Sequence, residues 1–178
     1  MKPRDIIDFW MAQPQKKLFS VDPEFDAELR DRFGAAHADA VAGKLDGWLE
    51  TLDGRLALVL LLDQMSRNLG RGTPAMFAHD DKALAIASRA IAEGDRTSLP
   101  PAEYRWHVMP FMHSEKLADQ DRCVELCREA GLEDTLPHAI EHRDIIARFG
   151  RFPHRNRILG RETTANEQQF LDEGGFSG

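Results

Sequence analysis

The sequence has little cysteine and no long apolar run. Cys123 and Cys127 lie four residues apart in a helical stretch, so their side chains run parallel and a disulfide is not expected. They fit two small buried apolar groups better than a C-x-x-C redox pair. No apolar run approaches the roughly 20 residues of a membrane span, and acids interrupt the first ten positions, where a signal peptide needs an apolar stretch. We expect a soluble, cytoplasmic protein without a membrane partner.

Long linkers, low-complexity tracts and an excess of basic charge are also lacking. The 178 residues carry a net charge of −7, so most of the surface repels a phosphate backbone and general nucleic-acid binding is not expected. A chain of this length can bury one good core. We predict a single helical domain over residues 1–178, and the sequence leaves its oligomeric state open.

Common catalytic and metal motifs are scarce. The chain lacks a G-x-S-x-G elbow and a Walker lysine, so nucleophilic catalysis and phosphate-loop chemistry have little support. His138, Glu141 and His142 fit the H-x-x-E-H pattern of one class of zinc proteases. A third ligand at a recognisable downstream spacing is missing. We therefore predict no metal site, and the sequence leaves any cofactor unknown.

The chain does contain helical periodicity with clear end signals. Asp22 and Pro23 begin a predicted helix that ends near Gly43. Its apolar residues recur at intervals of three and four: Phe25, Leu29, Phe33, Ala36 and Ala40. Further helices are predicted over residues 53–68, 80–93, 101–109, 114–130 and 133–149, and a last one begins at Thr164 with a capping box to Glu167. No period-two strand pattern competes, so the predicted fold is all-α.

A weak internal repeat accompanies these helices. Five positions are matched 34 residues later, with four identities and one acidic match: Arg71, Phe77, His79, Asp81 and Lys82 by Arg105, Phe111, His113, Glu115 and Lys116. A 34-residue period of helix pairs is typical of tetratricopeptide arrays. The tetratricopeptide consensus itself is absent, so chance similarity remains the alternative.

A strip of arginines near the end of the chain is the main polar feature. Residues 148–161 hold five arginines and no acid, while the rest of the chain holds 18 Lys and Arg against 30 Asp and Glu. Gly150, Pro153 and Gly160 break the helix here, so the arginines lie on a shaped loop where they can converge. Such a cluster holds either an internal carboxylate or an anionic ligand.

A second polar group follows the all-apolar run of residues 56–62. Asp63 and Arg67 lie one helical turn apart, as do Gln64 and Asn68. The two members of each pair can therefore satisfy one another. Buried charges are usually paired. Self-satisfaction and a ligand site both remain open.

A third group lies around the predicted N-cap Ser114. Glu115 and Asp119 share one helix face, where two carboxylates must share a proton, bind a cation or meet arginines. The strip is the obvious source of those arginines. We therefore predict that Asp63, Glu115 and Asp119 lie within salt-bridge reach of arginines from the strip.

These groups together define the candidate site. The candidate catalytic residues are His113, Glu115, Asp119 and His154. The candidate ligand-binding residues are Asp63, Gln64, Arg67, Asn68, His113, Glu115, Asp119, Gln120, His142, Arg148, Arg151, His154, Arg155, Asn156 and Arg161. The alternative is an internal ion-pair network that clamps the last helices to the core.

Three segments also carry a family resemblance. They are Leu61-Leu62-Asp63-Gln64-x-x-Arg67-Asn68-x-x-Arg71-Gly72-Thr73-Pro74, Pro110-Phe111-Met112-His113-Ser114-Glu115-x-x-x-Asp119-Gln120, and the strip Arg148 to Arg161 with Thr164 and Glu167. In this order they resemble the DUF924 family. The resemblance runs from Phe9-Trp10 to Phe170-Leu171 and implies a tetratricopeptide-like fold, with antiparallel hairpins in one compact right-handed superhelix. It implies no biochemical function.

The chain departs from the family pattern at two places. Met11-Ala12-Gln13-Pro14 follows Phe9-Trp10 where the family has a Phe-Gly motif, and Met65-Ser66 stands where the family has Phe-Pro.

Two hypotheses for the function of the protein remain. We prefer a binding protein for a small anionic molecule or an acidic protein segment, and the alternative is an enzyme that performs acid–base chemistry on a small phosphate- or carboxylate-bearing metabolite.

Overall fold

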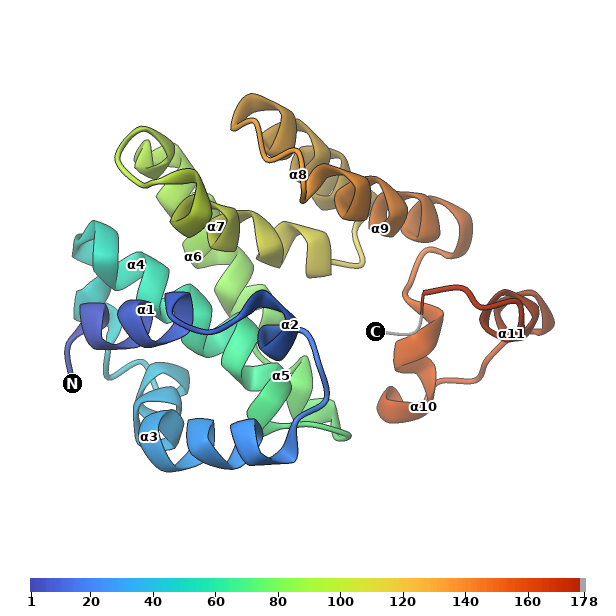
Figure 1. Ribbon diagram of the computed structural model, residues 1–178. Coiled ribbons are helices and arrows are strands. Elements are labelled where there is room, and N and C mark those ends of the chain that lie inside the picture. Colours follow the sequence, from blue (N-terminus) through green and yellow to red (C-terminus); the bar gives the residue numbers. More distant parts are fainter. Residues whose placement is uncertain (177–178) are drawn as a thin grey trace.

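The computed structural model describes residues 1–176, which contain helices and no strand (Figure 1). In chain order the elements are α1 (Pro3–Met11), α2 (Gln15–Leu18), α3 (Pro23–Val41), η1 (Asp46–Glu50), α4 (Leu52–Val59), η2 (Leu60–Met65), α5 (Ser66–Leu69), η3 (Pro74–Met76), α6 (Asp80–Ala92), η4 (Asp95–Thr97), α7 (Pro101–His113), α8 (Leu117–Glu129), α9 (Leu136–Phe149), η5 (Pro153–Arg155), α10 (Asn156–Leu159) and α11 (Ala165–Asp172). The predicted all-α class is confirmed.

Local cap chemistry determines several helix ends. The Asp22 side chain accepts hydrogen bonds from the backbone N–H groups of Glu24 and Phe25, at 3.1 and 3.0 Å, and so begins α3. Thr164 and Glu167 form the predicted capping box at α11. All five predicted apolar positions of α3 are buried. These parts of the prediction are confirmed.

The predicted helix over residues 53–68 contains a wide turn. Residues 60–65 form the π-helix η2 between α4 and α5. Leu56 to Leu62 are completely buried, as their all-apolar sequence predicted, and Asp63 follows them with no exposed surface. π-turns occur frequently at functional sites because they alter the facing of the residues that follow.

Three other helices also have boundaries that differ from prediction. Helix α7 continues past Met109 and through Pro110 to His113. Helix α8 begins at Leu117, because Ser114 is extended and its hydroxyl donates to Asp119 at 2.6 Å. Ser114 is therefore not the N-cap of α8, although its oxygen accepts from the Lys116 backbone at 3.2 Å. Helix α9 begins at Leu136, three residues later than predicted.

The helices pack in sequence on one another. α4 packs on α1 and α6, and α6, α7, α8 and α9 each pack on the next. The 34-residue match does not join equivalent elements, since Phe77 lies in a turn before α6 while Phe111 lies inside α7. The superhelical handedness implied by the family resemblance stays a prediction.

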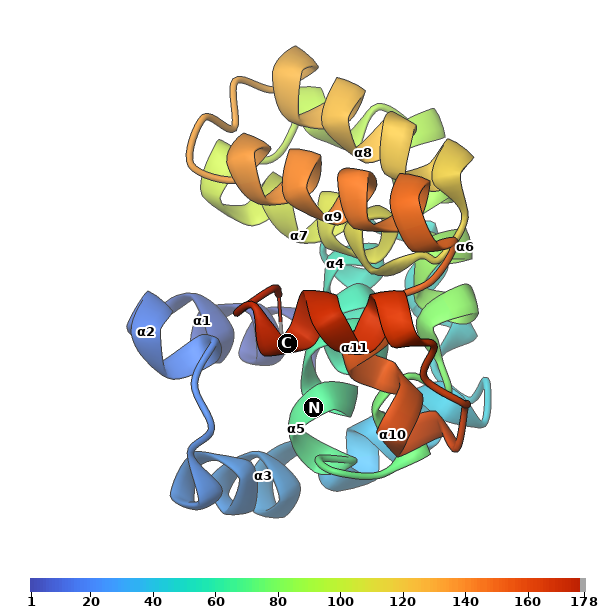
Figure 2. The ribbon, with the colours of Figure 1, turned by 90° about the vertical axis from the view of Figure 1, so that its right-hand side faces the viewer.

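Most of the buried apolar residues belong to the elements from α1 to α9 in chain order. A second cluster around Ile145, Ile146 and Phe152 adds Phe149, Phe170 and Phe176 from the C-terminal segment. Helices α10 and α11 lie at one side of the molecule, and Figure 2 shows α11 between α9 and α10. Within residues 1–176, no helix combines the length and the apolar character needed to cross a membrane.

Candidate functional site

The turn η2 brings a buried carboxylate to two helix ends. Asp63 accepts a hydrogen bond from Nδ1 of His113 at 2.7 Å and lies 3.0 Å from Nη1 of Arg67. Burial raises the pKa of Asp63, but the Arg67 charge and the His113 hydrogen bond outweigh burial and hold that pKa below its usual range. Asp63 is therefore ionised at neutral pH and fixes both partners.

A second carboxylate joins Arg67 to the arginine strip. The Arg67 guanidinium makes two hydrogen bonds to Asp80, at 3.0 and 3.1 Å, and Arg155 approaches Asp80 at 3.5 Å. Arg155 also donates to the backbone oxygen of His113 at 3.0 Å. Its guanidinium lies between the Phe77 and Phe152 rings, at 4.5 and 4.6 Å. Burial lowers the pKa of Arg155 to about 10, so it stays charged at pH 7.

Three neutral imidazoles surround this charged group. Burial lowers the pKa of His113 below its usual value, and Arg67 lowers it further. Burial also lowers the pKa of His142 to about 4 and that of His154 to about 3, with Arg155 adding to the second shift. Phe176 packs on both His142 and His154. Burial is therefore the main cause of these shifts.

Arg151 and Arg161 of the strip form a connected series of internal ion pairs with Glu167 and Glu115. Glu115 accepts from Arg161 at 2.7 and 3.0 Å and from the Phe152 backbone at 2.7 Å. Arg151 binds Glu167 at 2.6 and 2.9 Å. Asn156 connects the two pairs, because its side chain accepts from Arg161 at 3.0 Å and donates to Glu167 at 3.3 Å. These contacts join the C-terminal segment to the loop between α7 and α8.

The predicted pairing of acids with the strip is confirmed in part. Glu115 pairs with the strip arginine Arg161, as predicted. For Asp63 the prediction is wrong, because its arginine is Arg67 of α5. For Asp119 it is also wrong, because the carboxylate accepts from Ser114 instead.

Gln64 and Asn68, which could have satisfied one another, bond to separate partners. Gln64 donates to its neighbour Asp63, and Asn68 donates to Asp26 at 2.8 Å. Gln120 donates to the backbone oxygens of Met112 and Ser114, at 2.7 and 2.6 Å, and so holds the turn before α8. These amides satisfy internal groups.

Sequence reasoning missed the acids that complete the network. Asp80 and Glu167 each pair with a strip arginine, and Asp26 pairs with Arg71. Asp80 and Glu167 lie in first helical turns, where acids are common for reasons of helix capping alone. Their pairing could only be found once the helices were placed in space.

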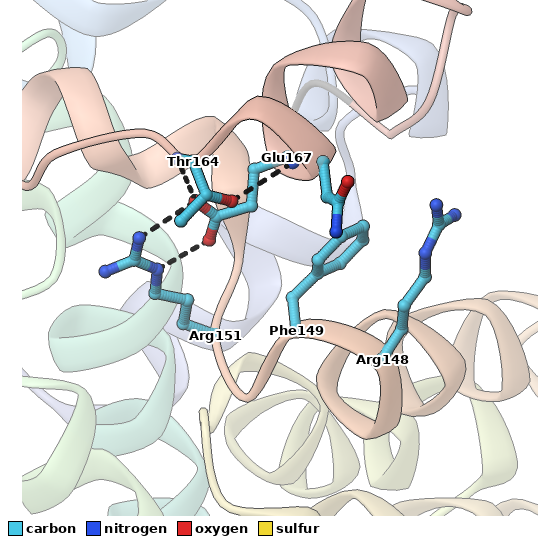
Figure 3. A pocket seen from close by; sticks show the side chains of 6 residues that line it. Arg148, Phe149, Arg151, Thr164 and Glu167 are labelled. Atoms are coloured by element: carbon cyan, nitrogen blue, oxygen red, sulfur yellow. Dashed lines mark hydrogen bonds and ion pairs between the residues drawn. The ribbon is translucent and has the colours of Figure 1, made fainter.

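A hollow of about 440 Å³ lies beside the strip, between the end of α9 and the start of α11 (Figure 3). It is lined by Arg148, Phe149, Arg151, Thr164, Asn166 and Glu167. Figure 3 shows Arg151 reaching Glu167 on one side and Arg148 on the other, with Phe149 between them. An adjoining hollow of about 260 Å³ shares Arg148 and Phe149 and extends over Phe170 and Phe176.

Arg148 differs from the paired arginines around it. Its guanidinium lies over the rings of Phe149 and Phe170, at 4.6 and 5.7 Å. Within residues 1–176, no carboxylate lies within salt-bridge distance of Arg148. The side chain is exposed, so its donors face the hollow and the solvent.

The histidine pair of the zinc-like pattern does not converge. His138 is exposed, while His142 is buried and its Nδ1 lies 2.8 Å from the His138 backbone oxygen. In the part of the chain that the structure describes, no group of three or more His, Cys, Asp or Glu side chains is arranged to hold a metal ion. Cys123 and Cys127 are buried free thiols, as predicted.

Comparison with known proteins agrees with this architecture. The model of a family described as "Bacterial protein of unknown function (DUF924)" matches residues 6–175. A solved structure of a protein of unknown function from Agrobacterium tumefaciens is 47% identical, with a TM-score of 0.91 over 97% of each chain. Among curated proteins, none matches the chain.

Proposed function

We propose a binding function for this chain, which belongs to the DUF924 family of bacterial proteins of unknown function. The hollow between α9 and α11 holds a small anionic molecule or the acidic end of a protein segment. The observation that carries the proposal is Arg148, an exposed guanidinium at the hollow without a carboxylate partner among residues 1–176.

The charges around the hollow favour an anion. Arg151 is neutralised by Glu167, which leaves Arg148 as the uncompensated charge of the lining. A guanidinium presents a planar fork that matches the oxygens of a carboxylate or phosphate. Its stacking on Phe149 and Phe170 holds the side chain in place, so less rotamer freedom is lost on binding.

The size and remaining lining favour a small ligand with an apolar part. A volume of about 440 Å³ lies within the range typical of small-molecule pockets. Phe149 supplies an apolar part of the lining, while Thr164 and Asn166 supply polar groups. This arrangement supports recognition of a compact carboxylate or phosphate, or of an acidic chain end.

The alternative function, acid–base catalysis on a small charged metabolite, has separate support in the Asp63–His113 pair. Of the four candidate catalytic residues, Glu115 is held by Arg161, Asp119 accepts from Ser114, and burial lowers the pKa of His154 to about 3. His113 would therefore be the acid–base residue.

Beyond these two functions, we propose that the helices form a tetratricopeptide-like superhelix and that the protein acts in the cytoplasm.

A thermal-shift screen of small carboxylates and phosphates tests the binding function, because a ligand stabilises the native state by mass action. We expect a set of related anions to raise the melting temperature of the wild type and to leave Arg148→Met unaffected. Arg157→Met is the matched control, since Arg157 is an exposed arginine of the same strip outside the hollow. Equal shifts in all three proteins would contradict the proposal.

A further inference from the structure

A second site lies at the π-turn, separate from the hollow beside Arg148. We propose that His113 is a general base, positioned by Asp63, for a small anionic substrate that carries an acidic proton. Asp63 is completely buried, whereas the side chains of His113, Arg67 and Asp80 are 12, 18 and 16% exposed. His113 and Arg67 both contact the buried carboxylate, and Asp80 contacts Arg67.

The hydrogen bond to Asp63 determines which ring nitrogen of His113 is free. An ionised carboxylate only accepts hydrogen bonds, so a neutral His113 carries its proton on Nδ1 and donates it to Asp63 at 2.7 Å. Nε2 then carries the lone pair, and no hydrogen bond from residues 1–176 occupies it. A neutral imidazole held in this tautomer by a carboxylate is the arrangement of a general base.

The backbone also holds His113 in place. Its carbonyl oxygen accepts from Arg155, and Gln120 binds the carbonyls of Met112 and Ser114 on either side. The π-turn supplies the facing carboxylate. An ion-pair network alone does not require an oriented imidazole with a free ring nitrogen.

The charges around His113 indicate the substrate class. Arg67 of α5 and Arg155 of η5 balance Asp63 of η2 and Asp80 of α6, while His142 of α9 and His154 of η5 are neutral. When His113 takes up a proton, this cluster gains one positive charge. The electron pair left on the substrate balances that charge, and an anionic group of the substrate can contact the Arg67 guanidinium, which is 18% exposed.

The proposed step is a proton transfer. The Nε2 lone pair forms a bond to the acidic hydrogen, the bond from that hydrogen to the substrate breaks, and its electron pair stays on the substrate. Asp63 stabilises the imidazolium that forms. The imidazolium returns the proton to another atom of the substrate, so the step requires no oxidant or second reactant.

Carbethoxylation of the full chain by diethylpyrocarbonate tests the free, neutral Nε2, because this reagent acylates the unprotonated imidazole. With peptide mapping over a pH series, we expect His113 to be labelled with half-maximal rate below pH 6.5, the ordinary value for histidine. Inorganic phosphate should slow labelling at His113 and leave the exposed His138 unchanged. No labelling, a midpoint at or above 6.5, or no protection by phosphate would overturn the proposal.

Asp63→Asn tests the positioning role, with Asp119→Asn as the matched control whose carboxylate contacts Ser114. Loss of the Asp63 charge should lower the labelling midpoint of His113 by about 1 pH unit or more, and the control should match the wild type. If Asp63→Asn does not fold, nitrogen-15 spectra of the wild-type histidines decide the same point. The Nδ1–H tautomer at pH 7 is expected, and an Nε2–H tautomer would overturn the proposal.

Discussion

Arg148 and Arg151 lie three residues apart, and their surroundings give them different roles. Arg151 makes two hydrogen bonds to Glu167, whose side chain is 3% exposed. Arg148 lies on aromatic rings and is exposed. Residue type and position in the strip therefore do not separate a structural arginine from a ligand-binding one.

Replacing Arg151 by methionine should destabilise the fold. The change leaves the Glu167 carboxylate buried without its cation, which lowers the free energy of unfolding. Urea unfolding of the two proteins measures the difference. Arg148→Met is the control and should lie within about 0.5 kcal/mol of the wild type. Equal stabilities of all three proteins would show that the Arg151–Glu167 pair does not stabilise the fold.

His154→Gln should lower the melting temperature and flatten its dependence on pH. The pKa of His154 is about 3 in the folded chain against an ordinary 6.5, so the unfolded chain takes up the proton first as pH falls. The stability that neutral His154 contributes is complete above pH 6.5 and is lost as the pH falls toward 3. A glutamine does not titrate in this window, and it loses the ring contacts with Phe152 and Phe176.

Melting curves from pH 7 to 4, together with ligand titrations, check this expectation. A variant that melts within a few degrees of the wild type yet no longer binds the anion would assign His154 to the ligand instead. A variant that melts and binds as the wild type does would remove His154 from both roles.

At the scale of helices, the sequence predicted the features that depend on neighbouring residues and missed those that depend on tertiary packing. Asp22 with Pro23 and Thr164 with Glu167 were predicted because a cap depends on neighbours in sequence. The π-turn and the continuation of α7 through Pro110 were not predicted, since they depend on what packs around them. The site follows the same rule: Glu115 was matched to the strip by charge, while the role of Asp80 required the positions of α5, α6 and η5.

The start of α4 supplies a test of close packing at a helix end. A Cβ added to Gly54 would collide with the Trp48 backbone oxygen and with Thr51 Oγ1, the cap of α4. Gly54→Ala should therefore destabilise the protein by roughly 1 to 3 kcal/mol. Gly47→Ala, where a Cβ meets nothing within 4 Å, should change stability by less than about 0.5 kcal/mol. Chemical denaturation compares the two, and equal effects would contradict this account of the turn.

Across the whole molecule, the ion pairs join the C-terminal segment to three earlier elements. Arg155 reaches Asp80 at the start of α6 and the carbonyl at the end of α7, and Arg161 reaches Glu115 in the loop before α8. We therefore predict that residues 1–178 unfold as a single domain. Calorimetry should give one transition with equal calorimetric and van 't Hoff enthalpies. The single-domain prediction would be contradicted if the wild type showed a separate early transition and Arg161→Met abolished that transition.

The central claim is that the hollow beside Arg148 binds an anion. Titration calorimetry with the strongest ligand of the thermal-shift screen measures it most directly, in the wild type, Arg148→Met and Arg157→Met. The account predicts tight binding by the wild type and Arg157→Met and a loss of about tenfold or more in Arg148→Met, the value of one charge-assisted contact. Unchanged affinity in Arg148→Met, or an equal loss in Arg157→Met, would contradict it.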